Sequence, residues 1–355
     1  MRFLDEGKWR HFVESHPMSN VFHTPEMFHV FARAKGHRPT LHAVTDNGGQ
    51  VLALLLPVQI ALKGGFLRRL MTRAVVYGSV LYDPSPAGEE ALATLLRTYT
   101  QEADSEVLFT ELRNLSDLSA VQPVLNDCGF VYEDHLNYLI DLDRPVEQVV
   151  QDIGTRTRKH IRRGLRKQEV VVEEITERDQ IGICYDLLRK SYTAVRIPLA
   201  DRSLFEALFD VLHPQGMVKF WLSRVGDAYV TASVELLYKD VMYGWYGGVD
   251  RAYGSYTPNE LLTWHILKWG AENGYRLYDF GGAGRPGEEY GVRDFKAKFG
   301  GDLVCYGRNI CVHAPALLRL SRWGYAAYRW LFPMVNKEGR SRGCLCDDAL
   351  YGHLQ

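Results

Sequence analysis

The stretch "GWYGGVDRAYGSYTPNELLTWHILKWGAENGYRLYDFGGA", residues 244–283, has the pattern of a strand, a helix and a second strand. The same order occurs earlier, where "VVYGSV" (75–80) precedes the helical "EEALATLLRTYTQEA" and the strand-like "EVLFTEL". An acidic residue lies near the end of the last strand in both, Glu111 in the first and Asp279 in the second. Either two ordinary β-α-β units resemble each other by chance, or the chain contains a duplicated α/β domain.

Hydrophobic periodicity along the whole chain alternates between the values typical of helices and of strands. Strands are expected at residues 40–46, 50–60, 74–81, 106–112, 130–141, 169–175, 217–224, 228–238, 241–248, 275–280 and 302–311. Helices are expected at residues 24–35, 88–104, 146–167, 178–193, 201–212, 258–273 and 314–332. We therefore predict a mixed α+β fold of the α/β class, with domains at 1–145 and 146–312 and a C-terminal helix and tail at 313–355.

The composition is that of an ordinary globular protein with a formal net charge of -1 over 355 residues. Attraction to an anionic partner must therefore come from a local patch. The N-terminal segment lacks the apolar run of a secretory signal, and the most apolar stretch, residues 51–62, is too short to span a bilayer and contains Pro57. These features predict a cytoplasmic protein.

The six cysteines are scattered and form no C-x2-C pair, so no metal site is predicted. Cys344 and Cys346 lie one residue apart in a polar tail, near His353. A reduced tail and a metal or redox role both fit this arrangement.

A basic segment, "TRTRKHIRRGLRK" (155–167), contains seven Arg or Lys residues and no acid. On a helix, Arg156, Lys159, Arg163 and Lys167 share one face. Such a run is either a solvated face or a surface that meets the phosphates of RNA or of a nucleotide sugar.

Two apparent motifs near residue 280 lack the neighbouring residues that each would need. Asp279-Phe280-Gly281 lacks the other segments of a protein kinase. Gly282-x-Gly284-x-x-Gly287 contains Pro286 and is followed by two acids, where a dinucleotide site needs a helix N-terminus facing pyrophosphate. With no metalloprotease, hydrolase or P-loop motif either, the chemistry must be of a kind that needs little sequence signature, and acyl transfer to an amine fits that description.

The segment "GVRDFKAKFGG" (291–301), together with "PNELLTWHILKWGAENGYRLYDFGGA" before it, resembles the Fem-type (FemA/FemB/FemX-like) branch of the GNAT superfamily. The resemblance extends to the opening helix near "VFHTPEMFHVFARAKGHRP" and to the basic segment. It implies two tandem GNAT-like domains, an aminoacyl-tRNA donor in place of a bound cofactor, and an amine-bearing envelope precursor that is linked to a nucleotide or a lipid.

The same resemblance implies that Lys296 is the active-site cation and that Thr193 and Arg196 contact the precursor. Asp279 and Glu111 are the candidate bases, although Asp279 could instead hold the glycine loop that follows it. The remaining candidates line or shape the substrate site through flat rings, a cation or close backbone approach; they are Tyr246, Tyr256, Arg251, Gly281 and Gly282.

Two departures from the family pattern concern the ligands. Where muropeptide-using relatives carry a tryptophan and a lysine, this chain has Met27 and Phe31, with Arg33 and Lys35 nearby. The loop that holds coenzyme A in acetyl-CoA-using GNAT enzymes corresponds here to "RAYGSY" (251–256), in which Tyr256 would crowd a pyrophosphate.

Three functions remain open. The first is aminoacyl-tRNA-dependent transfer of an amino acid to an amine of an envelope precursor. The second is an acyl-CoA-dependent N-acetyltransferase that acts on an amino sugar or nucleotide sugar, with the acyl thioester of coenzyme A as donor. The third is a non-catalytic GNAT-fold binding module. The aromatic and basic segment 314–332 either packs back on the first domain or contacts the inner face of a membrane.

Overall fold

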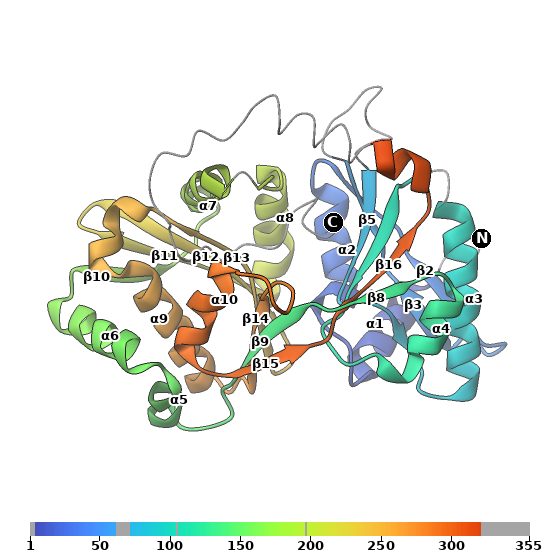
Figure 1. Cartoon of the computed structure of the whole chain (residues 1–355), viewed down its shortest axis with the longest axis horizontal. Coiled ribbons are helices and arrows are strands. Elements are labelled where there is room, and N and C mark those ends of the chain that lie inside the picture. Colours follow the sequence, from blue (N-terminus) through green and yellow to red (C-terminus); the bar gives the residue numbers. More distant parts are fainter. Residues whose placement is uncertain (1–3, 62–71, 104–105, 196, 321–355) are drawn as a thin grey trace. The chain divides into compact units, whose positions relative to one another are not determined.

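The chain is described by a computed structural model over residues 4–61, 72–103, 106–195 and 197–320. Within these residues it forms two compact units (Figure 1). Unit 1 comprises residues up to 134 together with those from 306 onward, and unit 2 comprises residues 135–305. This division differs from the predicted boundaries at 145 and 312, because a strand next to each predicted boundary joins the sheet of the other unit.

Unit 1 contains a six-stranded sheet in the order β1-β4-β5-β7-β16-β8 and a three-stranded sheet in the order β2-β3-β6. Its strands are β1 His37–Pro39, β2 His42–Thr45, β3 Val51–Leu55, β4 Val58–Ala61, β5 Thr72–Tyr77, β6 Leu81–Tyr82, β7 Phe109–Arg113, β8 Val131–Glu133 and β16 Arg308–Val312. Its helices are α1 Glu6–Ser15, α2 Pro25–Arg33, α3 Pro86–Ala103 and α4 Gln122–Asp127.

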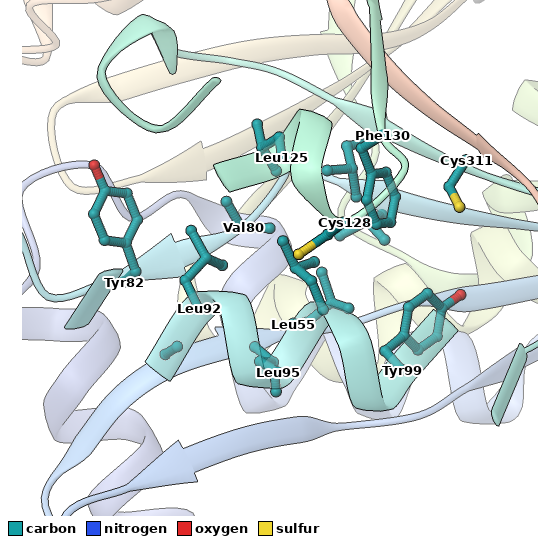
Figure 2. Close-up of a cluster of buried hydrophobic side chains, with 14 of the residues drawn as sticks. Leu55, Val80, Tyr82, Leu92, Leu95, Tyr99, Leu125, Cys128, Phe130 and Cys311 are labelled. Atoms are coloured by element: carbon teal, nitrogen blue, oxygen red, sulfur yellow. The ribbon is translucent and has the colours of Figure 1, made fainter. Parts of the chain in front are cut away.

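The main apolar core of unit 1 lies between α3, α4 and the sheets (Figure 2). Leu92, Leu95 and Tyr99 of α3 recur at helical spacing and face this core. On α2, Met27 and Phe31 are also buried, with exposed fractions of 0% and 1%. These two side chains therefore contribute to the packing of α2.

Unit 2 contains a seven-stranded sheet in the order β10-β11-β12-β13-β14-β9-β15. Its strands are β9 Leu136–Asp141, β10 Val170–Glu174, β11 Val218–Val225, β12 Ala228–Tyr238, β13 Val241–Val249, β14 Leu277–Gly282 and β15 Asp302–Cys305. Its helices are α5 Val146–Asp152, α6 Thr155–Lys167, α7 Ile181–Val195, α8 Arg202–Leu212, α9 Pro258–Glu272 and α10 Gly291–Lys296. The α5, α6 and α9 helices pack on one face of the sheet, while α7 and α8 cover the other.

Each unit contains one pair of parallel strands, and in each the pair is joined by a long helix. β5 and β7 are parallel and are connected through α3, whereas β13 and β14 are parallel and are connected through α9. Parallel neighbours need such a crossover, because a tight turn can only join antiparallel strands. The predicted duplication of a β-α-β unit in a mixed α+β fold is confirmed.

Three of the expected long strands are each two strands in different sheets. The stretch 50–60 breaks at Pro57, whose ring removes a ladder hydrogen bond, so β3 and β4 belong to separate sheets. The stretches 130–141 and 302–311 break between β8 and β9 and between β15 and β16, and at these breaks the chain passes from one unit to the other. Gly307 has φ 70° at the second break.

The expected helix at 146–167 is also two helices, because Ile153 and Gly154 are extended between α5 and α6. Residues 315–320 are helical, and the rest of the helix predicted at 314–332 lies outside the described residues, as do Cys344 and Cys346. Among the described residues, no helix has the length and apolar character needed to cross a membrane.

We predict that Gly248→Ala destabilises unit 2, because a Cβ on this residue of β13 would lie 2.9 Å from backbone atoms of Leu187 and Leu188 in α7. Backbone atoms cannot move aside as the end of a flexible side chain can. The free energy of unfolding, measured by urea denaturation, should therefore fall by about 1–3 kcal/mol. Gly254→Ala is the matched control, since no atom lies within 4 Å of its added Cβ. Equal stability of the two variants would contradict this packing.

Candidate active site

The buried polar residues Lys296, Glu235 and Asp279, which we call the polar centre of unit 2, lie near the point where the pairing of β13 and β14 ends. The two strands are in register only from Val241 opposite Leu277 to Tyr243 opposite Asp279. A register shift affects β12 and β13 at Val234/Glu235, and another affects β14 and β9 between Asp279 and Gly282. Such bulges redirect side chains and interrupt pairing, and they are frequent beside active sites.

Lys296, at the C-terminal end of α10, is the cation of this centre. Only 3% of the residue is exposed, and Nζ donates a hydrogen bond of 2.6 Å to the Gly282 carbonyl. Nζ also lies 5.6 Å from the centre of the Phe280 ring, a cation–π distance. The side chain is therefore held in a fixed position at the end of β14, which a surface lysine would not be.

Glu235 of β12 faces the same centre and was not among the residues expected from the sequence. It is fully buried, with an exposed fraction of 0%, and accepts a hydrogen bond from the Ser233 hydroxyl. Burial raises the pKa of Glu235 to about 7, although hydrogen bonds from Ser233 and Tyr278 and the charge of Lys296 act in the opposite direction. A carboxyl group with this pKa can hold or accept a proton near neutral pH.

The signal for Glu235 in the sequence is weak but identifiable. The strand "AYVTASVELLY" (228–238) contains one ionisable acid in an otherwise apolar and hydroxyl-bearing run. A lone acid in a long strand is compatible with a solvent-facing position, and only the central place of β12 in a sheet that helices cover on both faces makes it interior.

Asp279 is buried on β14 and is saturated with hydrogen bonds. Asn137 Nδ2 lies 3.2 Å from each carboxylate oxygen, and the Gly281 amide donates to Oδ1 at 2.7 Å. These donors anchor the start of the glycine loop and tie β14 to β9. The geometry therefore favours the second of the two roles expected for Asp279, which is to hold the loop.

The glycine loop after β14 is pinned through its carbonyl groups. Arg293 of α10 donates to the Ala283 carbonyl at 2.8 Å, to the Glu288 carbonyl at 3.1 Å and to the Arg285 carbonyl. A dinucleotide loop instead offers its amide groups to pyrophosphate at the start of a helix. The structure agrees with the exclusion of that motif, and it adds Arg293 as a loop-positioning residue that the sequence did not reveal.

Gly244 of β13 and Gly281 of β14 lie close together beside this centre. A Cβ on Gly281, which has φ +74°, would be 3.1 Å from the Gly244 carbonyl oxygen. A Cβ on Gly244 would lie 2.6 Å from the Tyr278 hydroxyl and 3.4 Å from Glu235 Oε2. Both positions therefore require glycine for close approach, as expected for Gly281.

The other expected residues of unit 2 are spread over the far face and the surface. Tyr246 packs its ring on Phe205 at 4.9 Å and on Tyr192 at 5.9 Å, against α7 and α8. Thr193 is exposed near the end of α7, and Arg196 lies outside the described residues.

Arg251 and Tyr256 begin and end the 3-10 helix Arg251–Tyr256, which separates β13 from α9. Asp250 precedes this helix and accepts a hydrogen bond from the Ala252 amide at 3.1 Å. The hydrogen bond from Lys190 lowers the pKa of Asp250, so its carboxylate is charged at neutral pH. The Asp250 carboxylate, which is paired with Lys190, thus already occupies the Ala252 amide of this turn, a donor that a pyrophosphate there would need.

Glu111, the other expected base, belongs to unit 1 and is surrounded by arginines. Arg308 pairs with its Oε1, while Arg113 and Arg73 lie 3.4 Å and 3.8 Å from Oε2. A carboxylate with three cationic neighbours is a poor proton acceptor. Its surroundings thus differ from those of Asp279 although the two lie at matching places in the repeat.

The basic segment forms helix α6, whose Arg156, Lys159, Arg163 and Lys167 are all exposed. Ile161 is buried in the unit 2 core, and Gly164 faces Leu261 of α9 closely enough that a Cβ would lie 2.6 Å from Leu261 Cδ1. One side of α6 is thus docked on α9, and the cationic side faces outward.

Comparison with known families identifies the second unit. Residues 155–296 match the family described as the acetyltransferase (GNAT) domain. The structure titled "Crystal structure of FemX" superposes with a TM-score of 0.69 at 16% identity and covers 90% of this chain and 98% of its own. The fold is that of a Fem-type GNAT protein. The resemblance noted in the sequence, and the two tandem GNAT-like domains that it implies, are confirmed at the level of the fold.

Two further structures resemble the fold of this chain more distantly. The C-terminal domain of a putative lysylphosphatidylglycerol synthetase from Agrobacterium fabrum has a TM-score of 0.55 at 13% identity, covering 91% of this chain and 95% of its own. A tandem GNAT protein from the clavulanic acid biosynthesis pathway has a TM-score of 0.54 at 12% identity, covering 88% and 95%. No curated protein sequence matches the chain.

We predict that Glu235→Gln removes a pH dependence of stability. The unfolded carboxyl group ionises near pH 4.5 and the folded one near pH 7, so Glu235 stabilises the fold fully below the lower value and loses this contribution as the pH rises. The free energy of unfolding of the wild type, relative to that of the variant, should fall by about 3 kcal/mol across this interval. Chemical denaturation at a series of pH values measures the difference, and parallel curves would refute a raised pKa.

Proposed function

We propose that this protein is an N-acyltransferase that moves an aminoacyl group from aminoacyl-tRNA to an amine of a cell-envelope precursor. The observation that supports this best is the ammonium group of Lys296, buried and fixed at the Gly282 carbonyl within the GNAT domain. The similarity to FemX in fold favours the aminoacyl donor over other acyl donors. In the proposed reaction the amine nitrogen forms a bond to the ester carbonyl carbon, and the ester bond to the tRNA breaks.

Lys296 would stabilise the negative charge that develops on the carbonyl oxygen in this reaction. A fixed cation in a water-poor site does so without reorganising during the step. The Gly282 carbonyl and the Phe280 ring hold Nζ in place from two sides. The reacting carbonyl oxygen would take a further donor position of the ammonium, which has three protons to offer.

The attacking amine must lose one proton, and the tRNA hydroxyl that leaves must gain one. We assign the proton-holding role to Glu235, because burial raises its pKa to about 7 and the Lys296 charge and the Tyr278 hydroxyl connect it to the centre. Asp279 is assigned the loop-anchoring role, since the Asn137 side-chain amide and the Gly281 backbone amide make three contacts with its oxygens. Glu111 is assigned no proton transfer in this scheme.

The outward face of α6 is the proposed contact for tRNA. Its exposed cations, Arg156, Lys159, Arg163 and Lys167, are carried by a helix whose other side is fixed to α9. A rigid row of cations attracts a polyanion by releasing counterions from its phosphates. This surface accounts for a strongly basic segment in a chain with a formal net charge of -1.

An acyl-CoA donor remains the alternative to aminoacyl-tRNA, and the turn before α9 bears on which of the two donors binds. Gly254 leaves open space, since no atom lies within 4 Å of an added Cβ. The Ala252 amide of the turn is nevertheless already taken by the Asp250 carboxylate, which disfavours pyrophosphate binding. Release of a thiol from acetyl-CoA in the presence of amino sugars would support the alternative, whereas transfer of label from charged tRNA without thiol release supports our proposal.

We predict that Lys296→Ala lowers the rate of label transfer from a mixture of charged tRNAs to cell-wall precursors by about 10²–10³-fold, the usual cost of losing one oxyanion donor. Lys298→Ala is the matched control two residues away. Its ammonium is 3.4 Å from Glu260 and 39% of its side chain is exposed, so the rate should change less than about twofold. Full turnover by the Lys296 variant would overturn the site assignment.

We also predict that replacing Arg156 and Arg163 together by Gln weakens tRNA binding and lowers the slope of log affinity against log salt by roughly 1.4–1.8. The control replaces Arg189 and Arg202, exposed arginines on α7 and α8, and should leave the slope unchanged. Filter binding at several salt concentrations measures both. Equal slopes for the two double variants would remove α6 from the proposed tRNA surface.

A further inference from the structure

Strand β9 pairs with β14 on both sides of the register shift that leads into the glycine loop. Before the shift Asp279 is opposite Leu139, and after it Gly282 is opposite Asn137. Two residues of β14 therefore lie opposite a single residue of β9, which is the arrangement of a β-bulge. Asn137 is thus the residue at which pairing resumes, opposite the glycine whose carbonyl accepts from Lys296.

The side chain of Asn137 reaches Asp279 across this bulge. Only 5% of Asn137 is exposed, and its Nδ2 lies 3.2 Å from each Asp279 carboxylate oxygen. Asp279 Oδ1 in turn accepts a hydrogen bond of 2.7 Å from the Gly281 amide. An ionised carboxyl group only accepts hydrogen bonds, so the NH2 group of Asn137 is the matching donor. Asn137 therefore helps to orient the carboxylate that holds the loop amide.

The backbone of β9 holds the same loop one residue further on. The Leu136 carbonyl accepts a hydrogen bond of 2.6 Å from the Ala283 amide, and the Leu136 amide donates to the Gly284 carbonyl at 2.9 Å. Gly282 thus lies between a side-chain contact at Asp279 and a backbone contact at Ala283. Two consecutive residues of β9 hold the loop before and after Gly282.

The position of Gly282 decides that of the Lys296 ammonium group, because Nζ donates to the Gly282 carbonyl at 2.6 Å. A donor that stabilises a developing charge must stay close to its productive position, and a misplacement of about 1 Å can cost a factor of about 10² in rate. Whatever fixes the glycine loop therefore also fixes the reacting geometry.

We propose that Asn137 is a positioning residue of the active site, which acts through Asp279 and the glycine loop to fix the ammonium group of Lys296. This role rests on the function proposed above, in which Lys296 stabilises charge during acyl transfer. The contacts lead from Asn137 to Asp279, from Asp279 to the Gly281 amide, and through the next residue's carbonyl to Lys296 Nζ. Asn137, Asp279 and Lys296 are all buried, so water does not readily replace a lost donor.

The first measurement is independent of acyl transfer. In Asn137→Asp the side chain keeps its shape but loses its donor and faces Asp279 with a like charge. In the full chain, hydrogen exchange at the Gly281 and Ala283 amides should become at least about tenfold faster, relative to the amides of β11. Asn273→Asp is the matched control, because Asn273 is exposed directly after α9, and it should leave both amides unchanged. Unchanged exchange in folded Asn137→Asp would overturn the proposal.

An exchange of the two side chains keeps the test decisive if Asn137→Asp folds poorly. In the double variant Asn137→Asp with Asp279→Asn, the new amide can donate to the new carboxylate, and its oxygen can accept from the Gly281 amide. This double variant should therefore regain most of the protection that Asn137→Asp loses. A double variant that exchanges as fast as the single one, or that does not fold, contradicts the proposed link between the two strands.

Transfer of label from charged tRNA then decides whether this link serves the reaction. Asn137→Asp should lower kcat at least about tenfold and change KM less than about twofold, because it displaces Lys296 without touching the substrate. Asn273→Asp should keep both constants. Faster exchange with an unchanged kcat would show a merely structural role and overturn the assignment. No transfer by the wild type would refute the proposed function, whereas the exchange measurement would still decide whether Asn137 holds the loop.

Discussion

The hydrogen bond from Lys296 to the Gly282 carbonyl is the constraint on which the proposed active site depends. It requires β14 to end in a loop whose carbonyl turns toward α10, and the register shift after Asp279 provides that turn. Arg293 then fixes the loop from the same short helix. Because α10 has only six residues, its position follows from these side-chain contacts more than from helix stability.

The two β-α-β units have the same arrangement of strands and helix, but their acidic residues have neighbours of different charge. At matching strands, Glu111 is enclosed by three arginines, whereas Asp279 is held by neutral amide donors. The Asp279 carboxylate in unit 2 therefore holds backbone and amide groups, whereas the Glu111 carboxylate in unit 1 lies among arginine side chains.

Sequence and structure agree most closely where a pattern is local. The helices α2, α3, α8 and α9 lie where the 3.6-residue period places them, and the basic face of α6 follows from spacing alone. The strand predictions are wrong where one long apolar run contains two strands that belong to different sheets. Pro57 is a local signal for one such break, but nothing in residues 130–141 marks that β8 and β9 belong to different units.

The sequence by itself determined the repeated β-α-β plan and the charge of α6, because periodicity and residue type are local properties. Only the tertiary structure decided the surroundings of each carboxyl group. The raised pKa of Glu235 comes from burial between β11 and β13, and the cationic surroundings of Glu111 come from strands far apart in the chain. Desolvation and ion pairing depend on neighbours that folding brings together, so residue order alone does not specify them.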